Sequence, residues 1–157
     1  MLVQTKYFGE IDLTEEKILT FENGIMGFEH LTKYTILYDT EKEQQGGIMW
    51  FQSVEEPSIA LPVINPLVVK PDYNPQVNEE LLQPLGDLNQ ENLCILLTLT
   101  VPSDLTKLTA NLKAPLIINA DTRKGCQLVV ENADYQVKYN VYDAIQKMKA
   151  EKGAASC

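Results

Sequence analysis

Residues 93–101 form a long and almost wholly apolar run, with shorter apolar runs before and after it along the chain. A run that is apolar on both faces predicts a strand buried in the centre of a sheet. The shorter runs are rich in β-branched and aromatic residues, and turn-forming residues separate them at short intervals. We therefore expect a mainly β fold: a small antiparallel β-barrel-like domain with one or two short helices, including a C-terminal helix.

The other strands are expected at the remaining short apolar runs, which cover residues 3–8, 18–21, 33–38, 48–54, 59–64, 116–118 and 127–131. The acidic segment 39–47 should be a hairpin loop. Residues 121–125 should form another turn, with Gly125 available for a positive φ. Pro62 and Pro115 lack a backbone N–H, so their segments should lie at sheet edges or strand starts.

Two helices are expected. Residues 140–149 begin with Asn140 as an N-cap and place apolar side chains on one face, at Val141, Ala144, Ile145 and Met148. Residues 78–83 form a weaker candidate, because Pro84 should stop it after a short distance. We expect residues 1–150 to form a single domain and residues 151–157 to be a flexible tail.

The charge balance limits the classes of partner. The chain has 22 acidic and 13 basic residues, a net charge of −9, and Arg123 as its one arginine. Nucleic acids and anionic membranes should repel such a surface, whereas a basic protein should be attracted to it. The same acidity also serves solubility alone, and charge by itself leaves that alternative open.

The cysteine pattern and the apolar segments indicate a cytoplasmic protein. Cys94, Cys126 and Cys157 are odd in number and lack the spacing of a metal knuckle, which suits a reducing cytosol. The N-terminus lacks the features of a signal peptide. No apolar stretch approaches the length of a transmembrane helix.

Catalytic groups are scarce. His30 is the one histidine, and the chain has neither a nucleophile elbow nor a phosphate-binding glycine motif. A catalytic site made of carboxylates alone is the remaining alternative, although acidic clusters are usually solvated charge. Two clusters could form it: Asp39, Glu41 and Glu43, and Glu55 and Glu56. We therefore predict no enzyme activity, no metal and no cofactor, and a surface that binds proteins.

One segment combines apolar residues with a proline in a way that suits a binding surface. Residues 111–119 read Asn-Leu-Lys-Ala-Pro-Leu-Ile-Ile-Asn. An exposed sheet edge there can pair with a partner's backbone, and a shallow groove can accept an amphipathic helix. The alternative is that the segment is a core strand with a turn.

An ordered series of short motifs covers most of the chain. Residues 21–29 read Phe-Glu-Asn-Gly-Ile-Met-Gly-Phe-Glu, and later motifs stand at 50–53 (Trp-Phe-Gln-Ser), 57–66, 71–73 (Pro-Asp-Tyr), 108–119 and 125–127 (Gly-Cys-Gln). Together they resemble the FliW family of flagellar assembly factors. Ala110 and Leu61 depart mildly from the pattern, where valine and phenylalanine are commoner in that family.

The resemblance implies a barrel-like domain that binds two proteins in the bacterial cytoplasm. One is flagellin, held before export. The other is the carbon-storage regulator CsrA, a small basic RNA-binding protein that represses flagellin translation. The implied role is that of a chaperone-like factor coupling the level of flagellin to its translation, without direct contact to nucleic acid or membrane.

We place the partner-binding surface at polar or rigid residues that interrupt apolar runs, because these are expected to face outward: Asn65, Pro66, Tyr73, Asn111, Ala114 and Pro115. Each can equally be a turn-former. Glu41, Glu43, Glu55 and Glu56 are further candidates for contacts to a basic partner. The competing hypothesis is a barrel that carries a small apolar ligand, whose mark would be an apolar cavity of roughly 300 Å³ or more.

Overall fold

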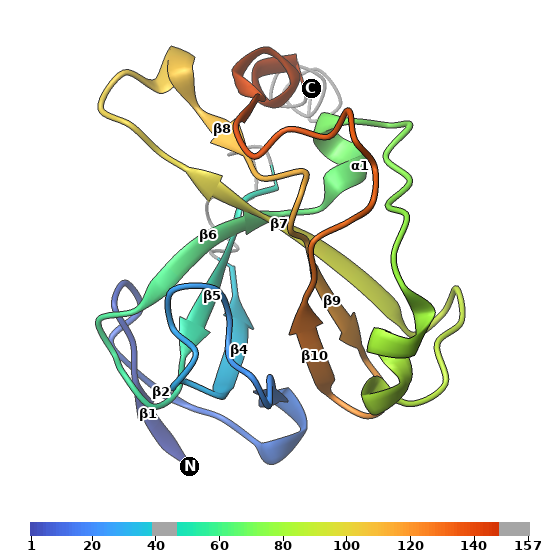
Figure 1. Ribbon diagram of the computed structural model, residues 1–157. Helices are drawn as coiled ribbons and strands as arrows, with labels where there is room; N and C mark the ends of the chain where they lie inside the picture. Colours follow the sequence, from blue (N-terminus) through green and yellow to red (C-terminus); the bar gives the residue numbers. More distant parts are fainter. Residues whose placement is uncertain (39–46, 148–157) are drawn as a thin grey trace.

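The computed structural model describes residues 1–38 and 47–147. Its main feature is a closed barrel (Figure 1), made of β3 (Leu19–Thr20), β4 (Lys33–Leu37), β5 (Met49–Ser53), β6 (Ala60–Ile64), β7 (Leu93–Thr100), β9 (Leu116–Asn119) and β10 (Lys124–Gln127). Going round the ring, the order is β7-β6-β5-β4-β3-β10-β9, and β9 pairs with β7 again. Closure leaves the ring without a free edge.

The neighbouring strands of the ring are antiparallel except for one pair. β3 and β10 run parallel, with Thr20 opposite Lys124. β7 joins both halves of the ring, because it pairs with β6 through Val63 and Thr98 and with β9 through Leu96 and Leu116. The mainly β, barrel-like architecture expected from the sequence is confirmed, with this one parallel contact added.

Short elements extend the barrel. β8 (Thr109–Ala110) pairs with the end of β7, and β11 (Tyr139–Asn140) pairs with β8. β1 (Leu2–Gln4) and β2 (Glu10–Asp12) form a separate two-stranded sheet. The helical pieces are α1 (Pro66–Val69), the 3-10 helices η1 (Glu15–Lys17), η3 (Glu79–Leu85) and η4 (Leu105–Lys107), and an α-helix at residues 142–147. Among the described residues, no helix is long and apolar enough to cross a membrane.

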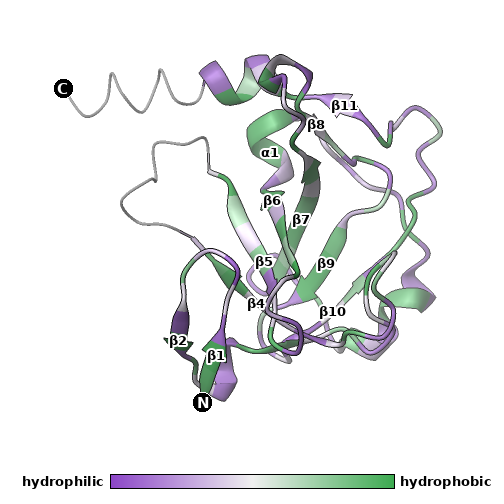
Figure 2. Ribbon diagram, turned by 90° about the vertical axis from the view of Figure 1, so that its left-hand side faces the viewer, coloured by the Kyte–Doolittle hydropathy of each residue, from purple (hydrophilic) through white to green (hydrophobic). Residues whose placement is uncertain are grey.

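Large side chains fill the barrel. Phe21, Tyr34 and Phe51 are all fully buried, and the rings of Tyr34 and Phe51 stack with centroids 4.3 Å apart. A second apolar cluster lies on the other face of β7, where Leu97 and Leu99 pack with residues of the C-terminal part of the chain. Successive side chains of a strand point to opposite faces, so β7 contributes to both clusters and is almost wholly apolar. Figure 2 shows this concentration of hydrophobic residues on the central strands.

The C-terminal helix confirms its predicted start and buried face. The Asn140 side chain accepts a hydrogen bond from the backbone N–H of Tyr142 at 3.1 Å. Val141 and Ile145 are buried against the second cluster. Figures 1 and 2 both place this helix beside α1 at one end of the barrel. Met148, the tail 151–157 and most of the hairpin loop 39–47 lie outside the described residues, and the division into one domain and a tail stays a prediction.

Several expected details are wrong. The last long strand covers 124–127 and not 127–131, so Gly125 lies inside β10, and the positive φ of that turn belongs to Arg123 at 60°. The first strand ends at Gln4, well short of residue 8. Pro84 lies within η3 and does not stop it, and the helix ends one residue later at Leu85.

Pro115 fits the expectation from its missing N–H, but Pro62 lies at neither a sheet edge nor a strand start, because β6 pairs with both β5 and β7. Pro62 sits inside β6, but pairing with β7 begins only at Val63, so one flank of Pro62 is open. Pro115 directly precedes β9, as expected for a strand start.

Candidate functional site

A groove of about 630 Å³ runs along the outside of the barrel. One wall is formed by residues 93–96 of β7, and the other by the segment 65–88, which descends from α1 beside the barrel (Figure 1). We call it the apolar groove. Its lining consists of Met49, Asn65, Pro66, Leu67, Tyr73, Asn74, Pro75, Val77, Leu82, Leu88, Leu93, Cys94, Ile95, Leu96 and Ile117.

Local sequence explains how the outer wall is held. Asn65 caps α1 by accepting a hydrogen bond from the Leu67 N–H at 3.0 Å, and Pro66 occupies the first helical position. Further along, the Tyr73 hydroxyl donates to the Leu112 carbonyl at 2.8 Å, and its ring stacks on Tyr135. The cap thus sets the start of α1 within the segment, and the Tyr73 contacts fix the segment to the body of the protein.

The groove has no charged lining residue, and two of its apolar side chains are open to solvent. Leu67 is 56% exposed and Leu93 is 41% exposed. Exposed leucines beside an apolar hollow form a surface that water solvates poorly. The groove can therefore receive an apolar face of another molecule.

The structure brings three predicted site residues together in this groove: Asn65, Pro66 and Tyr73. Asn65 is exposed as expected. The expectation that Pro66 and Tyr73 face outward is wrong, because both are buried and act in positioning the wall. Sequence reasoning missed α1 itself, although an asparagine followed by proline is a helix-start signal.

Asn111, Ala114 and Pro115 lie apart from the groove lining. The Asn111 side chain accepts hydrogen bonds from the N–H groups of Lys113 and Ala114, both at 3.0 Å, which makes a side-chain-stabilised turn. Ala114 and Pro115 are buried, so the expectation that they face outward is also wrong. These residues match the alternative interpretation, a turn followed by a core strand.

The acidic candidates that the structure describes lie in the turn after β5. The Glu55 carboxylate accepts hydrogen bonds from the N–H groups of Thr32 (2.7 Å) and Lys33 (2.9 Å), which hold the pKa of this carboxyl below its usual range. Glu56 accepts a hydrogen bond from the Ser58 hydroxyl at 2.8 Å. Both residues are exposed. Glu41 and Glu43 lie outside the described residues.

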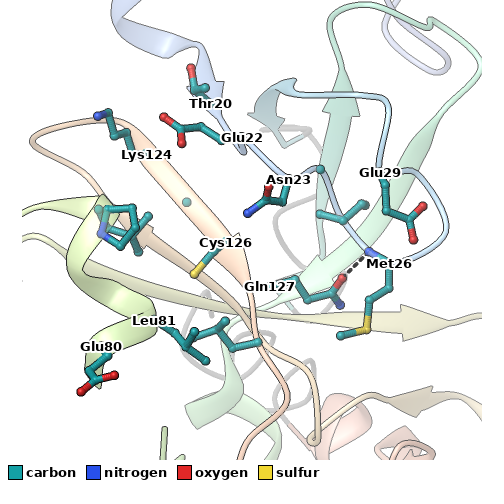
Figure 3. A pocket seen from close by; sticks show the side chains of 16 residues that line it. Thr20, Glu22, Asn23, Met26, Glu29, Glu80, Leu81, Lys124, Cys126 and Gln127 are labelled. Atoms are coloured by element: carbon teal, nitrogen blue, oxygen red, sulfur yellow. Dashed lines mark hydrogen bonds between the residues drawn. The ribbon is translucent and has the colours of Figure 1, made fainter. Parts of the chain in front are cut away.

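A second hollow, of about 320 Å³, was not foreseen from the sequence (Figure 3). We call it the acid-rimmed pocket. Its apolar lining consists of Ile25, Met26, Leu81, Pro84, Leu85, Cys126 and Leu128, and its charged residues are Glu22, Glu29, Glu80 and Lys124. The signal that could have found it is the pair of motifs at 21–29 and 125–127, which meet here.

The acid-rimmed pocket does not resemble a reactive site. Burial raises the pKa of the Cys126 thiol to about 11, which makes this cysteine a poor nucleophile at neutral pH. Within residues 1–38 and 47–147, no group of three or more histidine, cysteine or acidic side chains is arranged to hold a metal ion. What the pocket offers is shape and charge.

Comparison with known proteins agrees with this picture. The family model described as FliW protein matches residues 2–141. The chain belongs to the FliW family. A protein of Lachnoclostridium phytofermentans named flagellar assembly factor FliW is 55% identical over the whole of both chains. One of the same name from Lachnospira eligens is 51% identical, covering 94% of this chain and 98% of the other.

The FliW fold is also found in a solved structure. A crystal structure of the flagellar assembly factor FliW superposes with a TM-score of 0.81 at 30% identity, covering 90% of this chain and 96% of the other. Family membership and this superposition confirm the resemblance read from the motifs.

Proposed function

We propose that this FliW protein is a cytoplasmic flagellar assembly factor that binds flagellin and antagonises the translational repressor CsrA. It acts by binding and not by catalysis. When flagellin is scarce, the protein is free to bind CsrA and lift repression; when flagellin accumulates, it occupies the protein and repression returns. The observation that carries the flagellin half of the proposal is the uncharged apolar groove with its exposed leucines.

The apolar groove suits an amphipathic helix such as those at the ends of flagellin. An amphipathic helix buries its apolar face by lying in a hydrophobic groove. Because Asn65 and Tyr73 already fix the outer wall, little ordering cost is added on binding. Covering such a face before export would prevent flagellin from associating with itself.

The acidity of the chain supports the CsrA half of the proposal. A net charge of −9 attracts a basic protein and mainly accelerates the encounter. This attraction should weaken as salt is added, because the Debye length falls to about 8 Å at physiological ionic strength.

A matched pair of variants tests the role of the groove. Leu93 begins β7 and lines the groove, whereas Val101 follows the end of the same strand, is 51% exposed and lies outside the groove. Leu93→Lys should weaken flagellin binding by at least about tenfold, because a lysine would be desolvated there. Val101→Lys should leave the affinity unchanged. Isothermal titration with purified flagellin measures both, and equal affinities for the two variants would remove the groove from the proposal.

A small-ligand carrier is the second candidate, because the apolar groove exceeds the roughly 300 Å³ expected of a ligand site. The hollow lies outside the barrel, however, and the barrel interior is filled by buried aromatic side chains. Native mass spectrometry of protein purified from its own cytosol separates the two hypotheses. A stoichiometric bound lipid or metabolite would favour the carrier, and co-purified flagellin would favour the assembly factor.

A further inference from the structure

We infer that the acid-rimmed pocket is the docking site for the basic partner, and that it receives an apolar side chain flanked by lysine or arginine. The inference rests on the proposed function for the identity of that partner as CsrA. It assigns the partner to a surface distinct from the apolar groove, since the two hollows share no lining residue.

The pocket is built by three segments far apart in the sequence: the loop around residues 20–29, η3, and β10 with Leu128 after it. Gln127 of β10 accepts a hydrogen bond from the Met26 N–H at 2.8 Å, and its amide group donates to the Ala114 carbonyl at 3.0 Å. Figure 3 shows the first of these contacts at one end of the pocket, with Cys126 pointing into the hollow. This glutamine therefore ties the loop 21–29 to β10.

The backbone of the loop 21–29 and that of β10 are packed too closely to change shape easily. Gly24 has a φ of +64°, and a Cβ there would come within 2.5 Å of the Phe28 carbonyl oxygen. A Cβ at Gly125 would come within 2.4 Å of the Phe21 ring. A wall that is fixed before binding costs little ordering entropy when a partner arrives.

Two apolar side chains at the opening of the pocket are left exposed by the packing of the chain itself. Met26 is 51% exposed and Leu81 is 52% exposed, although both line the pocket. Each contributes an apolar surface that an inserted side chain would cover. The volume of about 320 Å³ is at the lower end of the range for ligand pockets, so the occupant is a small number of side chains and not a whole helix.

The charged residues around the pocket favour basic residues on either side of the inserted apolar side chain. Three glutamates face one lysine around the pocket, a larger acidic excess than the 22 to 13 of the whole chain. The backbone N–H groups of Glu29 itself and of Gly27 hold the pKa of the Glu29 carboxyl below its usual range, which keeps this carboxylate charged. The apolar groove has no such charges, so a basic segment is favoured here and disfavoured there.

Charge reversal at the rim provides the first test, with CsrA as the probe. The double variant Glu22→Lys, Glu80→Lys changes two exposed carboxylates of the pocket, and Glu16→Lys, Glu131→Lys changes two exposed carboxylates that do not line it. Both doubles carry the same net charge, so a general electrostatic effect is equal in the two. We expect CsrA affinity at low salt to fall at least about tenfold further in the pocket double than in the control.

A second pair of variants tests the apolar contact. Leu81→Ser removes an exposed leucine from the pocket, and Leu105→Ser removes a comparably exposed leucine, 55%, from η4. CsrA binding should weaken in the first and stay unchanged in the second, while flagellin binding by all four variants stays at the wild-type level. Equal CsrA affinities within both pairs would overturn the docking site and leave the proposed function intact. Failure of the wild-type protein to bind CsrA at micromolar concentration would overturn both.

Discussion

Gly125 of β10 and Phe21 are packed so closely that a Cβ at position 125 would lie 2.4 Å from the ring. Phe21 belongs to the aromatic cluster inside the barrel and is fully buried, so it cannot move aside without disturbing that cluster. Gly125→Ala should therefore destabilise the protein by about 1–3 kcal/mol through overpacking. Urea unfolding measures the loss, and Gly9→Ala serves as a comparison in which a Cβ meets no atom within 4 Å. Because Gly9 has a φ of +65°, its substitution reports backbone strain alone.

Two tyrosines are expected to respond in opposite ways to loss of the hydroxyl. The Tyr34 hydroxyl is buried without a hydrogen-bond partner among the described residues, and burial raises the pKa of Tyr34 to about 12. Tyr34→Phe removes an unsatisfied polar atom and should be neutral or stabilise by up to about 1 kcal/mol. Tyr73→Phe removes the bond to the Leu112 carbonyl and should cost about 1–2 kcal/mol. Thermal unfolding compares the two, and equal losses would contradict the difference in bonding.

Glu55 links stability to pH. Its folded pKa lies below the ordinary value of 4.5, because the N–H groups of Thr32 and Lys33 donate to the carboxylate. The ionised form therefore stabilises the fold above about pH 4.5, and this contribution is lost as the pH falls through the lowered folded pKa. Glu55→Gln should be less stable than wild type near pH 7, and the difference should shrink as the pH falls below 4.5. A difference in unfolding free energy between wild type and variant that stays constant as the pH is lowered would show that the charge of Glu55 has no such role.

The thiol of Cys126 reports on the acid-rimmed pocket. With a pKa of about 11, it is largely protonated at pH 8, so alkylation should be slow and should accelerate about tenfold per pH unit up to pH 10. The measurement uses a Cys94→Ala, Cys157→Ser background, so that one thiol remains. Mass spectrometry follows the modification. A fast reaction that does not depend on pH would mean that Cys126 is an exposed, low-pKa thiolate, contrary to the structure.

The strand pattern could be predicted because each central strand carries its own signal. Residues 93–101 are apolar on both faces because β7 separates the barrel interior, which receives Leu96, from the second cluster, which receives Leu97 and Leu99. The C-terminal helix was predictable for a similar reason, since Val141 and Ile145 fall on one face and both are buried.

Contacts between distant segments could not be predicted from local patterns. The parallel pairing of Thr20 with Lys124 depends on the path of the whole chain between them. Gly125 was expected to supply a positive φ in a turn, yet its lack of a side chain serves a close approach to Phe21. The same holds for the candidate site. Polar or rigid residues beside apolar runs were expected to face outward, but Tyr73 and Pro115 are buried. The Tyr73 hydroxyl bonds to the Leu112 carbonyl, and Pro115 directly precedes the buried strand β9.

Closure of the barrel depends on strands from both ends of the chain. β3 lies within the first twenty residues, and β10 ends only at Gln127. A nascent chain on the ribosome therefore has no complete ring until residue 127 has emerged, and the edges of β3 and β7 stay unpaired and exposed to water until then. Long-range closure of this kind slows folding and exposes strands that can pair wrongly. The proposed role is to guard flagellin against premature association, and during its own synthesis this protein passes through an interval in which its open strand edges carry the same risk.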